Sequence, residues 1–414
     1  MITTAPAPTA LASVDHLADA LASPSTAWPG GRPEAGRYWP QSLAAGASGI
    51  ALLHIERART GHGDWATAHV WLKAAVQGEV SAAANANLYF GAPALAYVLH
   101  RAASASSRYL PVLDRLDTAT LTLTRTRLRA AHQRISRAAR PLMEEFDLIR
   151  GLSGLGAYHL SRHLHHEITA DVIAYLVRLT EPLPAPAGLP PWWTDVAPSG
   201  VLHPDYPGGH GNFGLAHGIG STLAVLSQAL LGELTVPGMA GAIARICAWM
   251  DHWRQGDESA PWWPGHLSMQ QVTDHQVHSA LRPRPSWCYG VSGTARAQQL
   301  AGLALGDPAR VARAENAILS ALREPLQLDT LPETGLCHGM AGLLHAAWRM
   351  ATETDNPEIT AELPRLTDRL ITTLGQSDPN PELLDGTTGA ALALHTVGMG
   401  RAPAPHWDTF LALA

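Results

Sequence analysis

The sequence is poor in the residues that mark several common classes of protein. Only 15% of its 414 residues are charged, and Lys73 is the single lysine among 29 basic residues. The net charge of −6 gives no general reason to expect binding to nucleic acid or to a membrane surface. No apolar run is long enough for a transmembrane helix, and the N-terminus lacks the pattern of a signal peptide. We therefore expect a cytoplasmic protein without a transmembrane segment and without a nucleic-acid partner.

Cysteine is also scarce. The three cysteines are Cys247, Cys288 and Cys337, an odd and sparse set that does not form a disulfide framework. Such usage fits a reducing compartment. Cys247 falls on the apolar stripe of a helix expected near 238–254, so we assign it to the hydrophobic core.

Glycine, in contrast, is abundant and recurs in a short Gly motif that runs each time into a small, apolar helical segment. The leading glycines lie 45 to 72 residues apart, a period loosened by insertions. They are Gly46, Gly91, Gly151, Gly218, Gly290, Gly339 and Gly386. Between them lie longer amphipathic stretches near 12–22, 65–78, 119–138, 167–180, 238–254, 308–323 and 360–375.

This order predicts an all-α protein in which amphipathic outer helices alternate with small-residue inner helices. Helix pairs stacked in a line would leave two ends exposed, and a closed ring removes those ends. We therefore expect an α/α toroid (barrel) of seven inner and seven outer helices. The glycines would allow sharp turns and close helix packing, and the side chains just before them would converge at one mouth.

Two proline-rich, aromatic loops interrupt the repeats at 182–210 and around 260–267. Their tryptophans either contact a substrate or, as we prefer, pin the loops to the body of the protein; these are Trp192, Trp193, Trp262 and Trp263. An arginine-rich helix face is expected to be solvated, and a contact to an acidic partner is the weaker alternative. Its residues are Arg125, Arg127, Arg129, Arg134, Arg137 and Arg140.

Two cysteines occupy equivalent positions, two residues before a leading glycine. They are Cys288 in SWCYG and Cys337 in GLCHG, and His338 follows the second. Two thiolates and an imidazole suit a tetrahedral Zn²⁺, and three protein ligands leave the open position typical of a catalytic site. The alternative is two buried cysteines and an unrelated histidine. The shared repeat position favours the metal site.

Three further residues lie near these positions. His217 precedes Gly218, Asp147 opens DLIRGLSG, and Arg284 lies four residues before Cys288. Asp147 has an ordinary alternative as a helix cap, and Arg284 as a charged loop residue. His217 is more notable because it lies at the repeat position of the candidate ligands.

The segments FDLIRGLSG, NFGLAHG, RPSWCYG and GLCHGMAG resemble the lanthipeptide (lantibiotic) cyclase family, LanC, and the seven Gly motifs extend this resemblance from about 40 to 395. The resemblance implies one α/α toroid domain over residues 1–414 that holds one Zn²⁺ on Cys288, Cys337 and His338. It implies that Asp147, His217, Arg284 and Tyr289 are active-site residues. The sequence departs from the motif at Ser221, which stands where glycine is usual, and at Ala94. Because of Ser221, the sequence does not determine the residue at which the helix after His217 begins.

The family reaction is the addition of a peptide Cys thiol to dehydroalanine or dehydrobutyrine, which yields a lanthionine or methyllanthionine ring. On this basis zinc would ionise the thiol and His217 would transfer protons. Asp147 would orient His217 or contact Arg284, and Arg284 would stabilise the enolate. Tyr289 would hydrogen-bond at the site or pack beside it. The expected partners are a dehydrated precursor peptide with its leader, a separate dehydratase and an exporter. With these partners, the protein could also belong peripherally to a membrane-associated biosynthetic complex.

Two other functions are compatible with parts of the sequence. One is a non-catalytic, zinc-dependent LanC-like protein that binds thiols such as glutathione. The other is an α/α-toroid glycosidase, which needs a carboxylate pair, and only Asp147 and Asp385 are acidic near the repeat positions. The joint presence of Asp147, His217 and Arg284 favours the cyclase.

Overall fold

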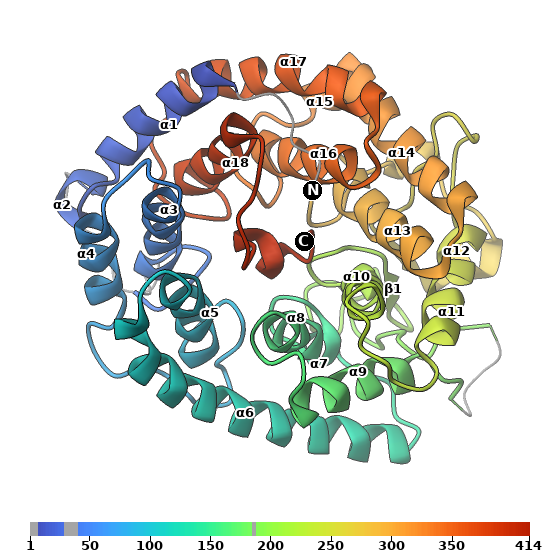
Figure 1. Ribbon diagram of the computed structural model, residues 1–414. Coiled ribbons are helices and arrows are strands. Elements are labelled where there is room, and N and C mark those ends of the chain that lie inside the picture. Colours follow the sequence, from blue (N-terminus) through green and yellow to red (C-terminus); the bar gives the residue numbers. More distant parts are fainter. Residues whose placement is uncertain (1–6, 29–39, 184–187) are drawn as a thin grey trace. The chain divides into compact units, whose positions relative to one another are not determined.

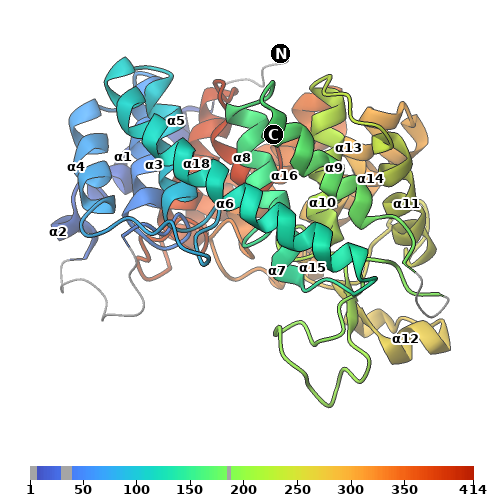
Figure 2. The same ribbon diagram turned by 90° about the horizontal axis from the view of Figure 1, so that it is seen from below.

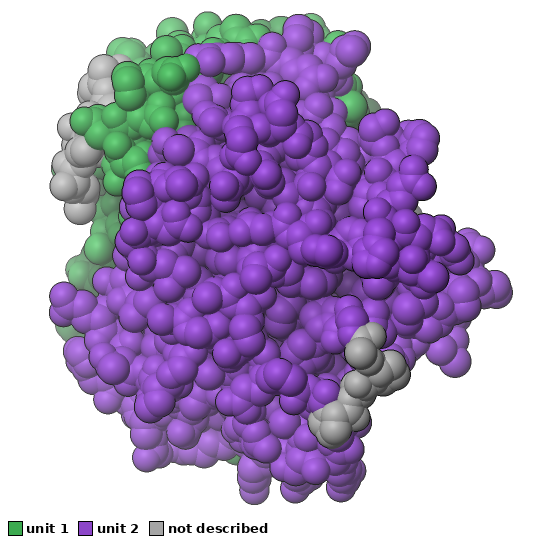
Figure 3. Space-filling model, turned by 90° about the vertical axis from the view of Figure 1, so that its right-hand side faces the viewer, with its two compact units in different colours: residues 1–123, 329–408 green, residues 124–328, 409–414 purple. Residues whose placement is uncertain are grey.

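The computed structural model describes residues 7–28, 40–183 and 188–414, which are predominantly helical. The chain divides into two compact units, distinguished by colour in Figure 3. Unit 1 comprises residues 1–123 and 329–408, and unit 2 comprises residues 124–328 and 409–414. The seven Gly motifs are thus divided between the units, four in unit 1 and three in unit 2.

Each Gly motif leads directly into a helix, as predicted, and these helices are almost entirely buried. In unit 1 they are α3 (Ala47–Arg59), α5 (Ala92–Ala103), α16 (Met340–Thr354) and α18 (Thr387–Met399). In unit 2 they are α8 (Leu152–Arg162), α10 (Ile219–Leu231) and α13 (Val291–Leu305). Their small side chains allow neighbouring helix backbones to pack closely, as inner helices surrounded by other helices must.

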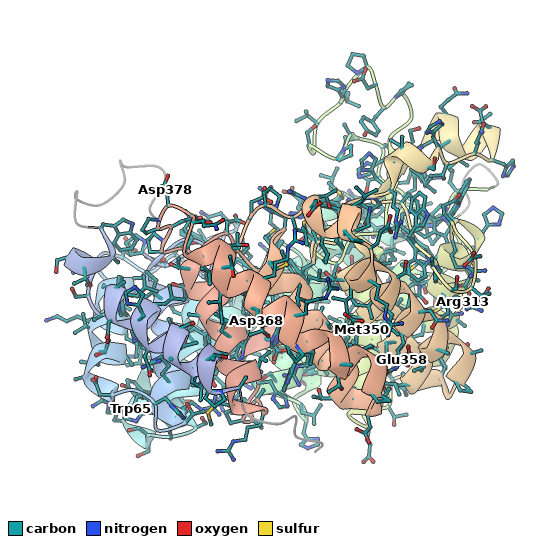
Figure 4. The ribbon with its side chains drawn as sticks, turned by 90° about the horizontal axis from the view of Figure 1, so that it is seen from above. Trp65, Arg313, Met350, Glu358, Asp368 and Asp378 are labelled. Atoms are coloured by element: carbon teal, nitrogen blue, oxygen red, sulfur yellow. The ribbon has the colours of Figure 1, made fainter. Side chains whose placement is uncertain are left out.

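The amphipathic stretches form the longer outer helices and bury one face each. These are α1 (Pro8–Ala20), α4 (Trp65–Ala75), α6 (Leu110–Ser136), α9 (Glu167–Leu179), α11 (Met239–His252), α14 (Pro308–Arg323) and α17 (Pro357–Leu374). Asp307 and Asn356 cap α14 and α17 through their side chains, and each helix then begins with proline. Figure 4 shows Glu358 and Asp368 on α17, both exposed. The described residues therefore contain the seven inner and seven outer helices that we predicted.

Packing joins inner helices to the outer helices that follow them in sequence. Within unit 1, α3 packs against α4 and α16 against α17; within unit 2, α8 packs against α9, α10 against α11 and α13 against α14. The last inner helix, α18, has no outer helix after it and packs instead against α1, at the other end of the sequence (Figure 1).

The proline-rich loops of unit 2 contain the only two strands in the described part of the chain. Strand β1 (His210–Asn212) pairs antiparallel with β2 (His266–Ser268), so that His210 faces Ser268 and Asn212 faces His266. Helix α12 (Met269–Asp274) follows β2 directly. Figure 2 shows α12 and the loop before β1 extending beyond the ends of α10 and α11. We call this part of unit 2, residues 188–212 and 255–286, the inserted lobe.

The remaining short elements connect the main helices. They are α2 (Pro24–Ala27), α7 (Met143–Phe146), α15 (Pro325–Asp329) and the 3₁₀ turns η1 (Ser107–Tyr109), η2 (Ser279–Leu281) and η3 (Trp407–Leu411). The burial of much of the chain after residue 400 was not predicted from the sequence. Trp407 and Asp408 pack in unit 1, whereas the Leu413 carbonyl of unit 2 accepts hydrogen bonds from the Arg296 guanidinium.

The four loop tryptophans are buried, which confirms that they pin the loops. Trp193 is fully buried and donates its indole N–H to the Gly208 carbonyl at 2.8 Å. Trp192 packs edge-on against Trp249 of α11. Residues 184–187 of the expected loop lie outside the described residues.

Most of the arginine-rich face has partners within the protein. Arg134 pairs with Glu145 at 2.5 Å and Arg125 with Glu167 at 3.0 Å. Arg127 donates to the Arg150 carbonyl, and Arg140 lies 3.5 Å from Asp195. These contacts give the face a structural role, and none of them requires an acidic partner. No helix in the described residues is long and apolar enough to span a membrane.

Candidate functional site

The leading glycines are required mainly by space. Six of them have extended backbone angles that any residue adopts, such as φ −121° and ψ −174° at Gly46, and Gly91 alone has a positive φ of 75°. A Cβ at Gly290 would lie 2.0 Å from the Arg284 carbonyl oxygen, and one at Gly218 would lie 2.4 Å from Asn212 Oδ1. The loop before each helix thus folds tightly onto its glycine, so the expected role in turning holds only for Gly91.

Backbone hydrogen bonds join the loops that precede the inner helices of unit 1. Leu43 N–H donates to the Tyr89 carbonyl at 2.8 Å, Leu384 N–H to the Ala44 carbonyl at 3.0 Å, and Cys337 N–H to the Leu384 carbonyl at 2.9 Å. The acceptor is each time the residue two places before a leading glycine. The next side chain along the chain is therefore held in an equivalent setting in successive repeats.

Unit 2 has the same pattern. Leu148 N–H donates to the Ala216 carbonyl at 3.1 Å, and Ala216 N–H donates to the Cys288 carbonyl at 3.2 Å. These bonds align the loops that carry Asp147, His217 and Tyr289. The convergence of side chains before the glycines, expected from the repeats, is thus present within this unit.

Asp147 and His217 form a directly hydrogen-bonded pair. Asp147 Oδ2 lies 2.7 Å from His217 Nδ1, while Asp147 Oδ1 accepts from the backbone N–H groups of Arg150 and Gly151, each at 2.7 Å. The Asp147 side chain is 1% exposed and that of His217 is 32% exposed. The carboxylate accepts the Nδ1–H and thereby leaves His217 Nε2 to face other groups. Asp147 therefore both holds the turn that leads into α8, which has no side-chain cap of its own, and orients His217.

Tyr289 lies beside this pair. Its ring stacks on that of His217, with centroids 6.2 Å apart and an angle of 30° between the planes. Gly214 fits against the same segment, because a Cβ there would lie 2.6 Å from the Cys288 carbonyl oxygen and 2.8 Å from Tyr289 Cδ1. The Arg284 carbonyl accepts from Ser286 N–H at 2.7 Å, which places Arg284 in the turn that leads to Cys288.

The candidate metal ligands occupy matching places before two inner helices. Cys288 is buried at the end of the loop before α13 in unit 2, with Sγ 3.6 Å from Ser286 Oγ. Cys337 and His338 lie directly before Gly339, the N-cap of α16 in unit 1, and are partly exposed. His338 Nδ1 lies 3.4 Å from Asp385 Oδ1, which belongs to the loop before α18.

Each of these three side chains offers one ligand atom of a kind that binds metal ions, a cysteine sulfur or an imidazole nitrogen. None of the three cysteines forms a disulfide. The donor set fits Zn²⁺, which binds thiolate sulfur and imidazole nitrogen. Cys247 is 1% exposed on α11, where burial raises the pKa of its thiol to about 12, which confirms its assignment to the core.

The unusual Gly motif of the fourth repeat leaves the helix start unchanged. Helix α10 begins at Ile219, directly after Gly218, as in the other repeats. Ser221 is buried and donates its hydroxyl to the Gly218 carbonyl at 2.8 Å. His217 therefore has the same position relative to its helix as Tyr289 and His338 have to theirs.

Two residues of the site were not singled out from the sequence. Asn212 is buried on β1 and its Oδ1 accepts from Gly214 N–H at 2.9 Å, which shapes the turn before His217. Asp385 was considered only as half of a carboxylate pair, and it instead lies beside His338. Their repeat positions, near or directly before a leading glycine, were the available signal.

Comparison with known proteins identifies the family of this chain. Residues 37–410 match the family model described as lanthionine synthetase C-like protein. The chain is 26% identical over 205 residues to the nisin biosynthesis protein NisC of Lactococcus lactis subsp. lactis, and the match covers 48% of each protein. This aligned part thus spans about half the length of that relative.

A solved structure of a nisin cyclase is similar over most of the chain. Its TM-score is 0.76 at 20% sequence identity, with 91% of this chain and 92% of that one covered. The nisin cyclase is an α/α toroid, so the predicted all-α toroid class is confirmed.

Proposed function

Because the chain belongs to the lanthionine synthetase C-like family, we propose that it is a cyclase that forms thioether rings in a dehydrated precursor peptide. A peptide Cys thiol would add to the β-carbon of dehydroalanine or dehydrobutyrine in the same peptide. The observation that carries the proposal is the Asp147–His217 pair beside Tyr289 and Cys288. This arrangement supplies an oriented proton-transfer group next to a candidate metal ligand.

We propose Zn²⁺ as the cofactor, with Cys288, Cys337 and His338 as its ligands. When bound, the metal would favour the thiolate form of the substrate Cys at neutral pH. The Asp385 carboxylate beside His338 would hold the imidazole in one orientation, as carboxylates commonly do for metal-binding histidines. Cys288 is fixed by its carbonyl, which accepts from Ala216 N–H.

His217 is the proposed general acid and base. Its Nδ1–H is held by Asp147, so Nε2 can accept the thiol proton and later donate a proton to the substrate Cα. The buried Asp147 carboxylate would stabilise the positive charge that His217 carries between these two steps. The same contact would keep the imidazole from rotating between them.

The reaction balances within the peptide. The sulfur–hydrogen bond breaks, a bond forms between sulfur and Cβ, and the electron pair of the Cα–Cβ double bond takes up a proton at Cα. The negative charge that develops on the adjacent carbonyl oxygen needs a cation, and Arg284 is the proposed one. Tyr289 would position the His217 ring through the stacking contact.

The proposed substrate is a precursor peptide with its leader, in which a separate dehydratase has already converted Ser and Thr residues. An exporter would remove the finished product. A protein that only bound thiols such as glutathione would have the same ligand set, but it would gain nothing from the Asp147–His217 pair. That pair is the reason to favour catalysis.

The test uses a synthetic peptide that contains one dehydroalanine and one Cys. Ring formation leaves the mass unchanged and removes the free thiol, so mass spectrometry after thiol alkylation distinguishes linear from cyclised peptide. We expect His217→Asn to retain zinc and to lower the rate by about 10²–10⁴-fold. The control is His165→Asn, which changes an exposed histidine of unit 2. Thiol binding without cyclisation by the unaltered protein would refute the cyclase and support the binding protein.

A second pair of variants tests the ligands. Cys337→Ala should abolish both stoichiometric zinc binding and cyclisation. Cys247→Ala should retain zinc because Cys247, on α11, is buried in the hydrophobic core. Full zinc retention in Cys337→Ala would disprove the ligand set.

A further inference from the structure

The inserted lobe of unit 2 encloses a cleft of about 590 Å³. The cleft lies among the loop before β1, strand β2, the start of α12 and the segment from η2 toward Arg284. Its lining includes Pro198, Tyr206, His266, Leu281, Pro283 and Tyr289. The sequence motifs pointed to only one of its residues, Tyr289, because the others come from separate stretches at 198–206, 265–271 and 281–283.

The cleft and the candidate site share Tyr289. This residue lines the cleft, and its ring also stacks on that of His217. The backbone before β2 comes close to Tyr289 on the cleft side, where a Cβ on Gly265 would lie 3.6 Å from Tyr289 Cβ. A peptide whose Cys lay beside His217 could therefore place a neighbouring side chain in the cleft.

The lining of the cleft carries a hydrogen-bonded polar pair. Two further polar residues of the lining, Ser268 and Gln271, bond to each other's backbone at the start of α12. Tyr206 Oη lies 2.7 Å from His266 Nε2, and their rings are 5.6 Å apart. Burial lowers the pKa of His266 and raises that of Tyr206, so both are neutral at neutral pH. With the Tyr206 hydroxyl as the donor to Nε2, His266 carries its proton on Nδ1 and can donate it to another group.

Charge is nearly absent from the lining. Asp205 is the single lining residue with a formal charge at neutral pH, and its side chain is 80% exposed. The other lining residues are uncharged at neutral pH: Pro198, Tyr206, Gly265, His266, Ser268, Gln271, Leu281, Pro283 and Tyr289. Such a surface accepts an apolar side chain and disfavours a carboxylate, which would lose its hydration and lie near Asp205.

We propose that this cleft is a specificity subsite that binds an uncharged, apolar residue of the precursor peptide close to the reacting Cys. The His266 donor would hold a backbone carbonyl of the same peptide segment. The proposal rests on the proposed function, since it identifies which peptides the same site prefers. It assigns to the inserted lobe a role in substrate selection that the ring of helices does not provide.

The experiment compares two dehydroalanine peptides that differ at one residue beside Cys, either Leu or Asp. With the unaltered protein we expect kcat/KM for the Leu peptide to exceed that for the Asp peptide by about 10-fold or more, which corresponds to about 1.4 kcal/mol. The difference should arise in KM. Equal values for both peptides would overturn the proposal.

The matched variants are Leu281→Arg and Leu326→Arg. Both leucines belong to unit 2 and are exposed, at 52% and 75%, but only Leu281 lines the cleft. Leu281→Arg should lower kcat/KM for the Leu peptide and raise it for the Asp peptide, with zinc content unchanged, whereas Leu326→Arg should change neither. His266→Phe should raise KM for both peptides without changing their ratio.

The possible failures are distinguishable. If the unaltered protein cyclises neither peptide while binding zinc, the proposed function itself fails, and the subsite with it. If it cyclises both peptides and Leu281→Arg behaves like Leu326→Arg, the cyclase stands and the subsite is wrong.

Discussion

At the scale of single residues, Asp147 shows what the sequence could and could not predict. Helix capping and orientation of His217 were alternatives in the sequence. In the structure one carboxylate oxygen binds the backbone of the turn before α8 and the other binds His217. The sequence could identify the residue type and its repeat position. It could not assign the two oxygens, because the second partner lies 70 residues away.

This division predicts different effects for two substitutions. Asp147→Asn keeps an oxygen that can accept from Arg150 and Gly151 N–H but loses the negative charge beside His217, so cyclisation should fall at least about 10²-fold with little loss of stability. Asp147→Ala should also lose the hydrogen bonds to the turn before α8, which costs about 1–3 kcal/mol more of unfolding free energy. Single-turnover cyclisation and urea denaturation measure the two effects. An Asn variant with unaltered turnover would remove Asp147 from the mechanism.

His395 predicts a pH dependence of stability. Its side chain is buried in unit 1 beside Thr60, and burial, aided by the charge of Arg57, lowers the pKa to about 3. In the unfolded chain His395 has a pKa near 6.5 and therefore binds a proton at a pH where His395 of the folded protein remains neutral. The contribution of His395 to the unfolding free energy is therefore present above pH 6.5 and is lost as the pH falls. The loss approaches about 1.4 kcal/mol per pH unit below about pH 6.

Urea denaturation at several pH values between about 6.5 and 4.5 measures this slope. His395→Gln should be less stable than the unaltered protein at neutral pH, but its unfolding free energy should fall less steeply toward acid. His165→Gln, at an exposed position, is the control and should keep the original slope. Parallel slopes for His395→Gln and the control would contradict the assignment.

At the scale of elements, the sequence predicted the helices well because burial and amphipathicity leave clear periodicities. Helices α14 and α17 begin within three residues of the expected starts, helped by caps and prolines. The β1–β2 pair was missed because each strand has three residues and the partners lie 56 residues apart. The tight fit of Gly214 against Cys288 and Tyr289 was also hidden, since it depends on two loops from different repeats.

The fit at Gly214 leads to a prediction. Gly214→Ala would place a methyl group 2.6 Å from the Cys288 carbonyl oxygen, so the loop that carries Cys288 and Tyr289 must shift. We expect cyclisation to fall about 10-fold or more and zinc affinity to weaken, with the helix content unchanged. Gly241→Ala on α11 is the control, because a Cβ there meets only the flexible end of Arg245 at 3.4 Å. Wild-type zinc affinity and rate in Gly214→Ala would show that the loop adapts freely.

At the scale of the whole molecule, the division into two units bears on the predicted single domain. The boundaries fall inside elements: between Leu123 and Thr124 in α6, between Leu328 and Asp329 in α15, and between Asp408 and Thr409 in η3. A linker between independent domains is usually exposed and irregular. We therefore propose that residues 1–414 unfold as one cooperative domain.

Destabilising one unit while observing the other tests this proposal. In unit 1, the buried Asp408 carboxylate binds Arg349 at 2.6 Å and His345 at 2.7 Å, and despite burial these groups hold the pKa of Asp408 well below its usual range. Asp408→Asn should cost about 3–5 kcal/mol. In unit 2, the buried thiol of Cys247, whose pKa is raised to about 12, reports unfolding by becoming open to alkylation.

If the chain is one domain, Asp408→Asn should shift the denaturant midpoint of Cys247 alkylation as far as it shifts the loss of helical signal. Asp368→Asn, at an exposed position of α17, is the control and should shift neither. An unchanged Cys247 midpoint in Asp408→Asn would mean that the units unfold independently.

The hydrogen-bonded loops before the inner helices also have a consequence for how such proteins diversify. Their bonds use only backbone groups, so the side chain just before each leading glycine can change without loss of the loop's own support. Those positions hold Ala45, Phe90, Arg150, His217, Tyr289, His338 and Asp385. Substitutions at these seven positions can therefore change the chemistry of the side chains while the backbone that supports them stays the same. A new activity would then need few substitutions.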